Sequence, residues 1–240
     1  MKSISTYLLC VRRIILLPRV LHHNTVCSMS TRAEKKAERK EKRQEIYKTL
    51  SKGAFSDFHD FRNTGGKNYV AQKGLIEKTS ASRFPSIEVE CLSGERTNIH
   101  NKLNNDATLV LLWMRAIGQP MCDIYRQHFQ REFQSVENVG TLELSIVEGP
   151  FYRMFRSFMI RSIKATVPQE RQSSFLCYFG STNNFQSKII ENTLVGHCFL
   201  VDSDGLIRWK AHAKPKEEEL EYMIDNTRTL IGNRIKIDKS

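Results

Sequence analysis

Apolar and polar positions between residues 84 and 232 follow patterns that predict strands alternating with helices. Thr108–Met114 is a continuous apolar run, which is typical of a strand buried on both faces. Residues 121–136 carry apolar side chains at helical spacing, and residues 197–212 alternate around the turn Asp202–Gly205, which predicts a β-hairpin. The predicted elements are strands at Ile87–Leu92, Thr108–Met114, Thr141–Val147 and Phe175–Phe179, helices at 121–136 and Phe151–Lys164, the hairpin strands His197–Val201 and Leu206–His212, and a helix that begins at Pro215 and ends at Gly232.

This order of elements predicts an α/β fold that resembles thioredoxin. A parallel βαβ unit leads through a helical stretch into an antiparallel hairpin and a closing helix. The additional strand at Ile87–Leu92 is similar to the one found in peroxiredoxin-like members. We therefore expect a thioredoxin-like, peroxiredoxin-like three-layer sandwich that occupies residues 84–232, with a short tail at 233–240.

The two sequence features that define a thioredoxin active site are missing. The redox cysteines would follow the first core strand, at a helix N-terminus that stabilises a thiolate. There the chain has Gln119 at the nucleophile position and Cys122 at the second, more buried position. The cis-proline expected before the hairpin is absent from Thr193–His197. A resolving thiol cannot complete a dithiol cycle alone, so Cys122 is either a buried small apolar residue or the centre of a residual thiol activity.

No cofactor or metal site is predicted. All six cysteines are isolated, with no CxxC pair of the kind that a zinc ribbon or a redox motif needs. His197 and Cys198 are neighbours on a strand and point to opposite faces, so they cannot chelate one metal ion. His128 and His212 are interpreted as isolated histidines on the surface or in the core.

Charge distribution separates the N-terminal third from the rest of the chain. The formal net charge is +11; residues 1–80 contain 17 Lys/Arg and 7 Asp/Glu, and residues 81–240 contain 20 and 19. A DNA-binding core would carry its positive charge on the folded part, so DNA is not an expected partner. No small-molecule substrate is indicated either.

The first 31 residues have the composition of a mitochondrial transit peptide. No acidic residue precedes Glu34, and arginine and hydroxyl-bearing residues are frequent. A secretory signal is the competing interpretation, but Arg12 and Arg13 interrupt its apolar stretch. No later segment approaches the ~20 apolar residues of a membrane span. Residues 32–50 predict a basic charged helix or arm, which either keeps the chain soluble or binds RNA or lipid, and residues 51–83 are interpreted as a linker.

Two segments are candidates for contact with a partner or a membrane. The predicted helix Phe151–Lys164 contains no acidic residue. Its cations Arg153, Arg156, Arg161 and Lys164 fall opposite Phe151, Phe155, Phe158 and Met159. The helix is interpreted either as packed on the sheet with a solvated basic face or as a docking surface for anionic lipid, where each cation contributes about 1 kcal/mol. In the hairpin, Arg208 and Trp209 point to opposite sides, and Trp209 belongs either to the core or to a partner interface.

The hairpin carries a family resemblance. Residues 196–209, GHCFLVDSDGLIRW, resemble the signature of the mitochondrial ATPase complex subunit 10 family. The start at Phe84–Pro85, the turn at Leu92–Glu95 and the helix entry at Pro215–Leu220 are similar too, so the resemblance covers about residues 84–232.

This resemblance implies a non-enzymatic chaperone on the matrix face of the mitochondrial inner membrane. It would bind newly made subunit a (subunit 6) of ATP synthase and help it join the rotor ring, which assists assembly of the membrane (Fo) sector. It implies no catalytic residues. Two further hypotheses remain open: a mitochondrial thiol oxidoreductase that uses Cys122, and an RNA- or ribosome-associated factor that acts through residues 32–48.

Overall fold

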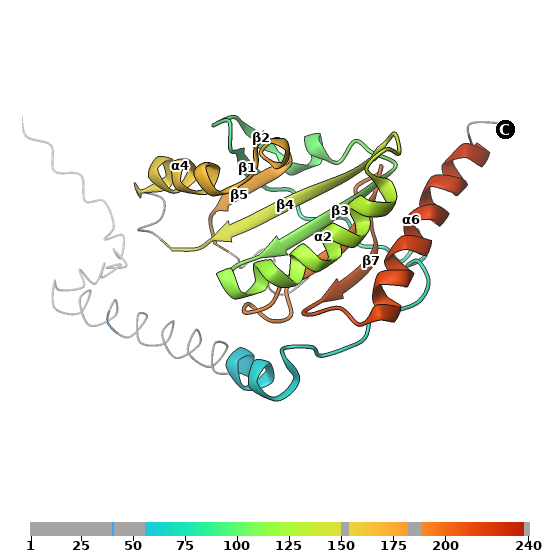
Figure 1. Ribbon diagram of the computed structural model, residues 1–240, viewed down its shortest axis with the longest axis horizontal. Helices are drawn as coiled ribbons and strands as arrows, with labels where there is room; N and C mark the ends of the chain where they lie inside the picture. Colours follow the sequence, from blue (N-terminus) through green and yellow to red (C-terminus); the bar gives the residue numbers. More distant parts are fainter. Residues whose placement is uncertain (1–39, 41–55, 150–153, 182–188, 238–240) are drawn as a thin grey trace, which may run out of the picture. The chain divides into compact units, whose positions relative to one another are not determined.

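The apolar run predicted as a buried strand forms the centre of the sheet. The computed structural model describes residue 40 and residues 56–149, 154–181 and 189–237 (Figure 1). All seven residues of β3 (Ala107–Trp113) are buried. β3 pairs in parallel with β4 (Val139–Val147) and antiparallel with β6 (His197–Asp202). Its central position therefore explains why β3 lacks the alternation of a half-solvated strand.

Seven strands form one mixed sheet in the order β2-β1-β5-β4-β3-β6-β7. The remaining strands are β1 (Glu88–Cys91), β2 (Arg96–Asn98), β5 (Phe175–Phe179) and β7 (Ile207–His212). β4 and β5 are parallel, whereas β1–β2 and β6–β7 are antiparallel hairpins. A parallel βαβ unit next to an antiparallel hairpin is the thioredoxin-like arrangement, so the predicted fold class is confirmed.

Three helices pack on one face of this sheet. They are α2 (Gln119–Phe133), α4 (Arg156–Thr166) and α6 (Glu217–Ile237). Their buried side chains, among them Phe129, Ile160 and Met223, belong to one apolar cluster with the sheet. In Figure 1, α4 lies at the end of the domain opposite α6. Short 3-10 turns occur at Ile99–Lys102, Ala116–Gly118 and Gln169–Arg171.

The opposite face of the sheet is covered by irregular segments in the part of the chain described. Its apolar cluster combines sheet residues such as Val110 and Phe199 with Phe84, Ile99 and Ile190 from outside the strands. These segments therefore cover the face of the sheet that lies opposite the three helices.

The predicted end of the last helix is wrong. α6 continues through Gly232 to Ile237, because a Cβ at Gly232 would meet no atom within 4 Å and a helical glycine weakens a helix without breaking it. The predicted tail at 233–240 therefore begins inside a helix.

Residues 56–83 are part of the domain and are not a linker. Residues 56–64 form a helix, and residues 66–84 run along edge strand β7; we call this second stretch the strap. Backbone N–H groups of Ile76 and Ile207 donate to Arg208 O and Ser82 O, at 2.7 and 2.8 Å. Because an uncovered edge strand can pair with other chains, the strap protects the sheet. The chain divides into units 1–46 and 47–240, and the predicted transit peptide and basic arm lie outside the described residues except for Lys40.

Candidate functional site

Neither cysteine position of a thioredoxin active site carries an accessible thiol in this fold. Gln119 is half-buried at the start of α2, and the Cys122 side chain is buried one turn later, at 2% exposure. Cys122 Sγ lies 3.7 Å from both Leu112 O and His197 O. Burial raises the pKa of the Cys122 thiol far above its ordinary value, and the charges of Asp123 and Glu143 act in the same direction. A thiolate is therefore strongly disfavoured at this site.

Gly196 lies in the segment where the proline was expected, and Gly118 packs against it beside Cys122. A Cβ added to Gly118 would lie 2.8 Å from Gly196 N and from Val195 C, and one added to Gly196 would lie 2.5 Å from Cys122 Sγ. No cis peptide bond occurs in the described part of the chain. The backbones of two segments thus pack directly together and leave no space for a substrate beside Cys122.

The other described cysteines, Cys91, Cys177 and Cys198, are also buried and form no disulfide. Burial raises the pKa of each thiol, that of Cys177 to about 12. These values match core thiols rather than reactive ones.

The hairpin brings His197 next to His212, which the sequence analysis interpreted as an isolated histidine. His197 and His212 are paired across β6 and β7 with 6.1 Å between ring centroids, and both side chains are buried. His197 Nε2 lies 2.9 Å from Asn192 O, and His212 Nε2 accepts a 2.8 Å hydrogen bond from Asn68 N–H of the strap. The hairpin pattern alone did not predict this pairing, because the register of β6 and β7 shifts between Leu200 and Val201. No cluster of three or more potential metal ligands is found among the residues the structure describes.

Both histidines are neutral in the folded state at neutral pH. Burial lowers the pKa of His212 to about 3, and the positive charges of a protonated His197, Lys67 and Lys210 act in the same direction. Burial also lowers the pKa of His197. At neutral pH the pair is therefore a structural element, and neither histidine is a protonated imidazolium that could act as a general acid.

We expect His212 to make the fold acid-sensitive. The unfolded chain takes up a proton near pH 6.5, whereas folded His212 does so only near pH 3. In this window the unfolded state binds more protons, so the free energy of unfolding falls with falling pH, by up to about 1.4 kcal/mol per pH unit. Urea unfolding of His212→Gln between pH 7 and about pH 5, where carboxylates contribute little, should show a shallower slope than the wild type. His59→Gln, at an exposed position, is the control, and equal slopes for His212→Gln and the wild type would contradict the prediction.

α4 presents a different face to the sheet from the one predicted. Ile160 is buried, while Phe155 and Phe158 are 53% and 71% exposed. Arg156 does not belong to an outer basic face, because it forms an ion pair with buried Glu90 of β1. The helical wheel placed Phe155, Phe158 and Arg156 on the wrong sides, because it took the phenylalanines as core residues and could not show that Glu90 lies beneath the helix. Arg161 and Lys164 are exposed, and Arg153 lies outside the described residues.

Arg208 and Trp209 are not available to a partner in this fold. Trp209 is 0% exposed, and its Nε1–H donates to Gln72 O of the strap at 2.8 Å. Of the two interpretations of Trp209, burial in the core is therefore correct and a partner contact is not, because the strap covers the side of β7 that the hairpin pattern left open. Arg208 donates to Ile76 O at 2.8 Å and to Asp202 Oδ2 at 3.1 Å, so its guanidinium fixes the strap to the hairpin.

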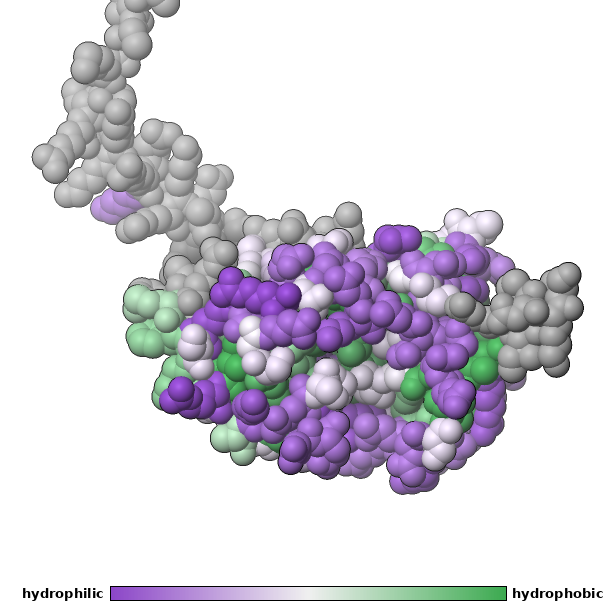
Figure 2. Space-filling model, turned by 90° about the horizontal axis from the view of Figure 1, so that it is seen from above, coloured by the Kyte–Doolittle hydropathy of each residue, from purple (hydrophilic) through white to green (hydrophobic). Residues whose placement is uncertain are grey.

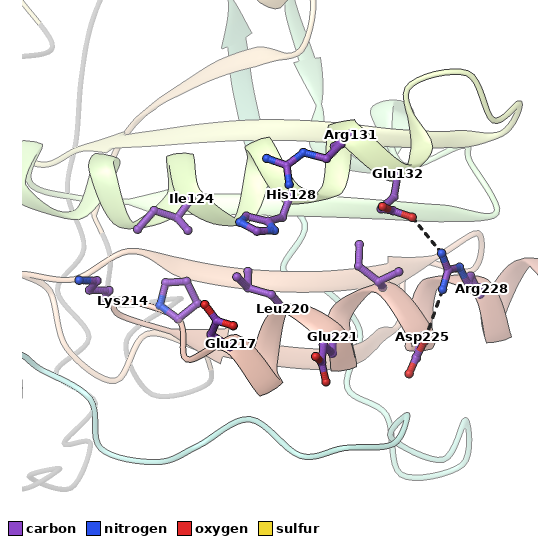
Figure 3. Close-up of a pocket in the computed structure, with 12 residues that line it drawn as sticks. Ile124, His128, Arg131, Glu132, Lys214, Glu217, Leu220, Glu221, Asp225 and Arg228 are labelled. Carbon is purple, nitrogen blue, oxygen red and sulfur yellow. Dashed lines mark hydrogen bonds and ion pairs between the residues drawn. The ribbon is translucent and has the colours of Figure 1, made fainter.

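An open groove of about 650 Å³ lies between α2 and α6 (Figure 3). Ile124 and Leu220 contribute apolar surface, and charged side chains of both signs surround them. Arg228 crosses between the helices, 2.9 Å from Glu132 and 3.7 Å from Asp225. Exposed ion pairs of this kind contribute little stability, and the mixed charges indicate no particular ligand.

Comparison with known proteins identifies the family. Residues 20–230 match the family model described as ATP10 protein. The chain belongs to the ATP10 protein family. Among curated relatives, the "Probable mitochondrial ATPase complex subunit atp10" of Schizosaccharomyces pombe is 17% identical over 195 residues, which cover 81% of this chain and 72% of the relative. The "Mitochondrial ATPase complex subunit ATP10" of Saccharomyces cerevisiae is 24% identical over 199 residues, which cover 73% and 70%. The resemblance carried by residues 196–209 is thus confirmed.

Solved structures to which this chain is similar include a putative thiol:disulfide interchange protein DsbE from Chlorobium tepidum, with a TM-score of 0.41, 12% identity and coverage of 62% of this chain and 96% of that one. BsSco, a member of the Sco family of cytochrome c oxidase assembly proteins, has a TM-score of 0.44, 12% identity and coverage of 65% and 96%. Within the described residues of this ATP10 family member, no helix combines the length and apolarity needed to cross a bilayer.

Proposed function

We propose that this chain is a non-enzymatic assembly factor for the membrane (Fo) sector of mitochondrial ATP synthase. It binds newly made subunit a (subunit 6) and promotes its association with the rotor ring, while attached to the matrix side of the inner membrane. Family membership carries this proposal: the matching model spans residues 20–230, and both curated relatives are named as subunits of the mitochondrial ATPase complex.

The closed thiol position supports a binding role over thiol chemistry. An exchange enzyme needs an exposed thiolate that attacks a disulfide and a second thiol that resolves the mixed disulfide. Here Gln119 stands at the first position, and the raised pKa and 2% exposure of Cys122 disfavour the second. The scaffold keeps its sheet and helices, so its surfaces remain available for holding another polypeptide.

Mitochondria that lack this protein test the proposal. We expect them to lose assembled Fo while the soluble catalytic sector persists, and re-expression of the full chain should restore assembly. Crosslinking during organellar translation should capture radiolabelled subunit a on the restored protein. Normal incorporation of subunit a without the protein would overturn the proposal.

The same cells separate binding from thiol chemistry. Cys122→Ala removes the sulfur but keeps a small apolar residue, and we expect it to restore Fo assembly to the wild-type level. Cys198→Ala, which removes another buried thiol, is the matched control for loss of packing. If Cys122→Ala fails while Cys198→Ala succeeds and both accumulate normally, Cys122 acts chemically and the non-enzymatic proposal is wrong.

A further inference from the structure

The exposed side of α4 combines apolar and cationic residues in an unusual order. Phe155, Phe158, Arg161 and Lys164 follow one another at intervals of three residues and are all exposed. Met154 precedes them and is 72% exposed. We call these five residues the outer face of α4, although Met154 and Phe155 immediately precede the first residue of the helix. Residues three apart are neighbours on a helix surface, so the row runs from an apolar end to a cationic end over about 14 Å.

Contacts on the inner side hold α4 in a fixed orientation. Ile160 is buried in the core, and Met159 and Ile163 pack against the same cluster. The Arg156 guanidinium forms an ion pair with Glu90 and lies 5.2 Å from the centroid of the Phe179 ring. Because apolar packing and an ion pair both fix this side, rotation of the helix cannot bury the phenylalanines in the core.

The outer face of α4 gathers a large part of the exposed apolar surface. Seven large apolar side chains are exposed among the described residues, and three of them, Met154, Phe155 and Phe158, lie within five positions. Hydrophobic surface protrudes at the left edge of the domain in Figure 2, the end at which Figure 1 places α4. Clustered exposed apolar side chains mark interaction sites, whereas single ones are common on soluble proteins.

The charges on the outer face of α4 indicate what binds to it. Residues 154–166 contain no acidic side chain, and the cations Arg161 and Lys164 continue the apolar row. We propose that the outer face of α4 docks on the anionic surface of a bilayer, with Met154, Phe155 and Phe158 inserted at the headgroup boundary and Arg161 and Lys164 bound to lipid phosphates. An apolar face bordered by basic residues is the pattern of interfacial helices, and a protruding row suits a deformable bilayer. This inference rests on the proposed function only for the identity of the membrane.

Flotation with lipid vesicles tests the inference. The full chain, isolated from mitochondria with a C-terminal tag, is mixed with phosphatidylcholine vesicles with and without cardiolipin. We expect Phe155→Ser/Phe158→Ser to reduce partitioning onto cardiolipin vesicles by at least about 10-fold. Arg161→Gln/Lys164→Gln should reduce it by about 25-fold at low salt, which corresponds to about five-fold per cation, and by much less at high salt.

Phe58→Ser is the matched control, because Phe58 is 59% exposed and lies outside α4. It should leave partitioning unchanged and shows what the loss of one exposed phenylalanine does elsewhere. Unfolding curves of all variants establish that they are folded. Arg161→Glu/Lys164→Glu provides a second variant of the two cations that keeps the phenylalanines. Equal partitioning of the α4 variants and the wild type would overturn the inference.

Two further results separate this inference from neighbouring ones. If the α4 variants detach from mitochondrial membranes but no form of the protein binds protein-free vesicles, the face docks on a protein and the lipid proposal is wrong. If vesicle binding depends on α4 while mitochondria without the protein assemble Fo normally, the membrane inference stands and the proposed function fails.

Discussion

Glu219→Ala is expected to lower the free energy of unfolding by about 3–5 kcal/mol, because it removes one partner of a buried ion pair. The Glu219 carboxylate is 0% exposed and pairs with Lys67 of the strap. Its oxygens also accept 2.8 Å hydrogen bonds from Ala71 N–H and Lys216 N–H. Alanine would leave the Lys67 ammonium with only the carbonyls of His212 and Lys214, and would leave the buried Ala71 N–H and the part-buried Lys216 N–H without this acceptor.

Urea unfolding of Glu219→Ala beside Glu218→Ala measures this effect. Glu218 is the neighbouring exposed residue on α6, and its replacement should change stability by less than about 0.5 kcal/mol. The double variant Lys67→Met/Glu219→Leu should be less destabilised than Glu219→Ala, since removal of both charges leaves neither one buried and unpaired. A loss below about 1 kcal/mol for Glu219→Ala would show that the pair does not hold the strap.

Local pattern was sufficient to predict six of the seven strands, including the closing hairpin, but not β2. The strand at Phe175–Phe179 has the predicted bounds, and β6 and β7 lie within a residue of the predicted hairpin strands. These elements are set by side-chain alternation, apolar runs and turn residues, all of which are local. The absence of a redox cysteine could be predicted in the same way. Once the strand at Thr108–Met114 is placed correctly, Gln119 and Cys122 fall at the start of the following helix.

Features that depend on distant contacts could not be predicted. The strap looked like a linker because its residues are polar and carry no periodic pattern, yet Lys67 binds Glu219 across 152 positions. Glu219 itself looked like one more acidic residue in the first turn of α6. The orientation of α4 failed for the same reason: Glu90, which draws Arg156 inward, lies on a strand far away in sequence.

The predictions for the candidate site residues differ from the structure more than the predictions for the fold do. Trp209 lies in the core, which was one of its two interpretations, whereas Phe155 and Phe158 were expected on the packed side of their helix and are exposed. The spacing of apolar residues ranks the faces of a helix by polarity but does not show which face meets the sheet. The exposed phenylalanines are therefore a departure from the expected pattern, and such departures are expected at functional sites.

Gly196→Ala and Gly118→Ala are each expected to lower the free energy of unfolding by about 2–3 kcal/mol through overpacking. A Cβ at Gly196 would lie 2.5 Å from Gly118 O and from Cys122 Sγ, and a Cβ at Gly118 would lie 2.8 Å from Gly196 N. Backbone atoms of two tied segments cannot move aside as a flexible side chain can. Both substitutions therefore force α2 away from the start of β6.

Gly232→Ala is the matched control, because a Cβ there meets no atom within 4 Å and alanine favours a helix interior by about 1 kcal/mol. Urea unfolding should thus show opposite signs for the same chemical change. Adding Cys122→Ala to Gly196→Ala should restore only part of the loss, since the carbonyl of Gly118 remains in the way. Full restoration of stability would mean that the clash with Cys122 Sγ alone causes the overpacking at Gly196. A stable Gly118→Ala would show that space remains where a thioredoxin-like enzyme binds its substrate, and thiol chemistry would then be disfavoured only by Gln119 and by the burial and raised pKa of Cys122.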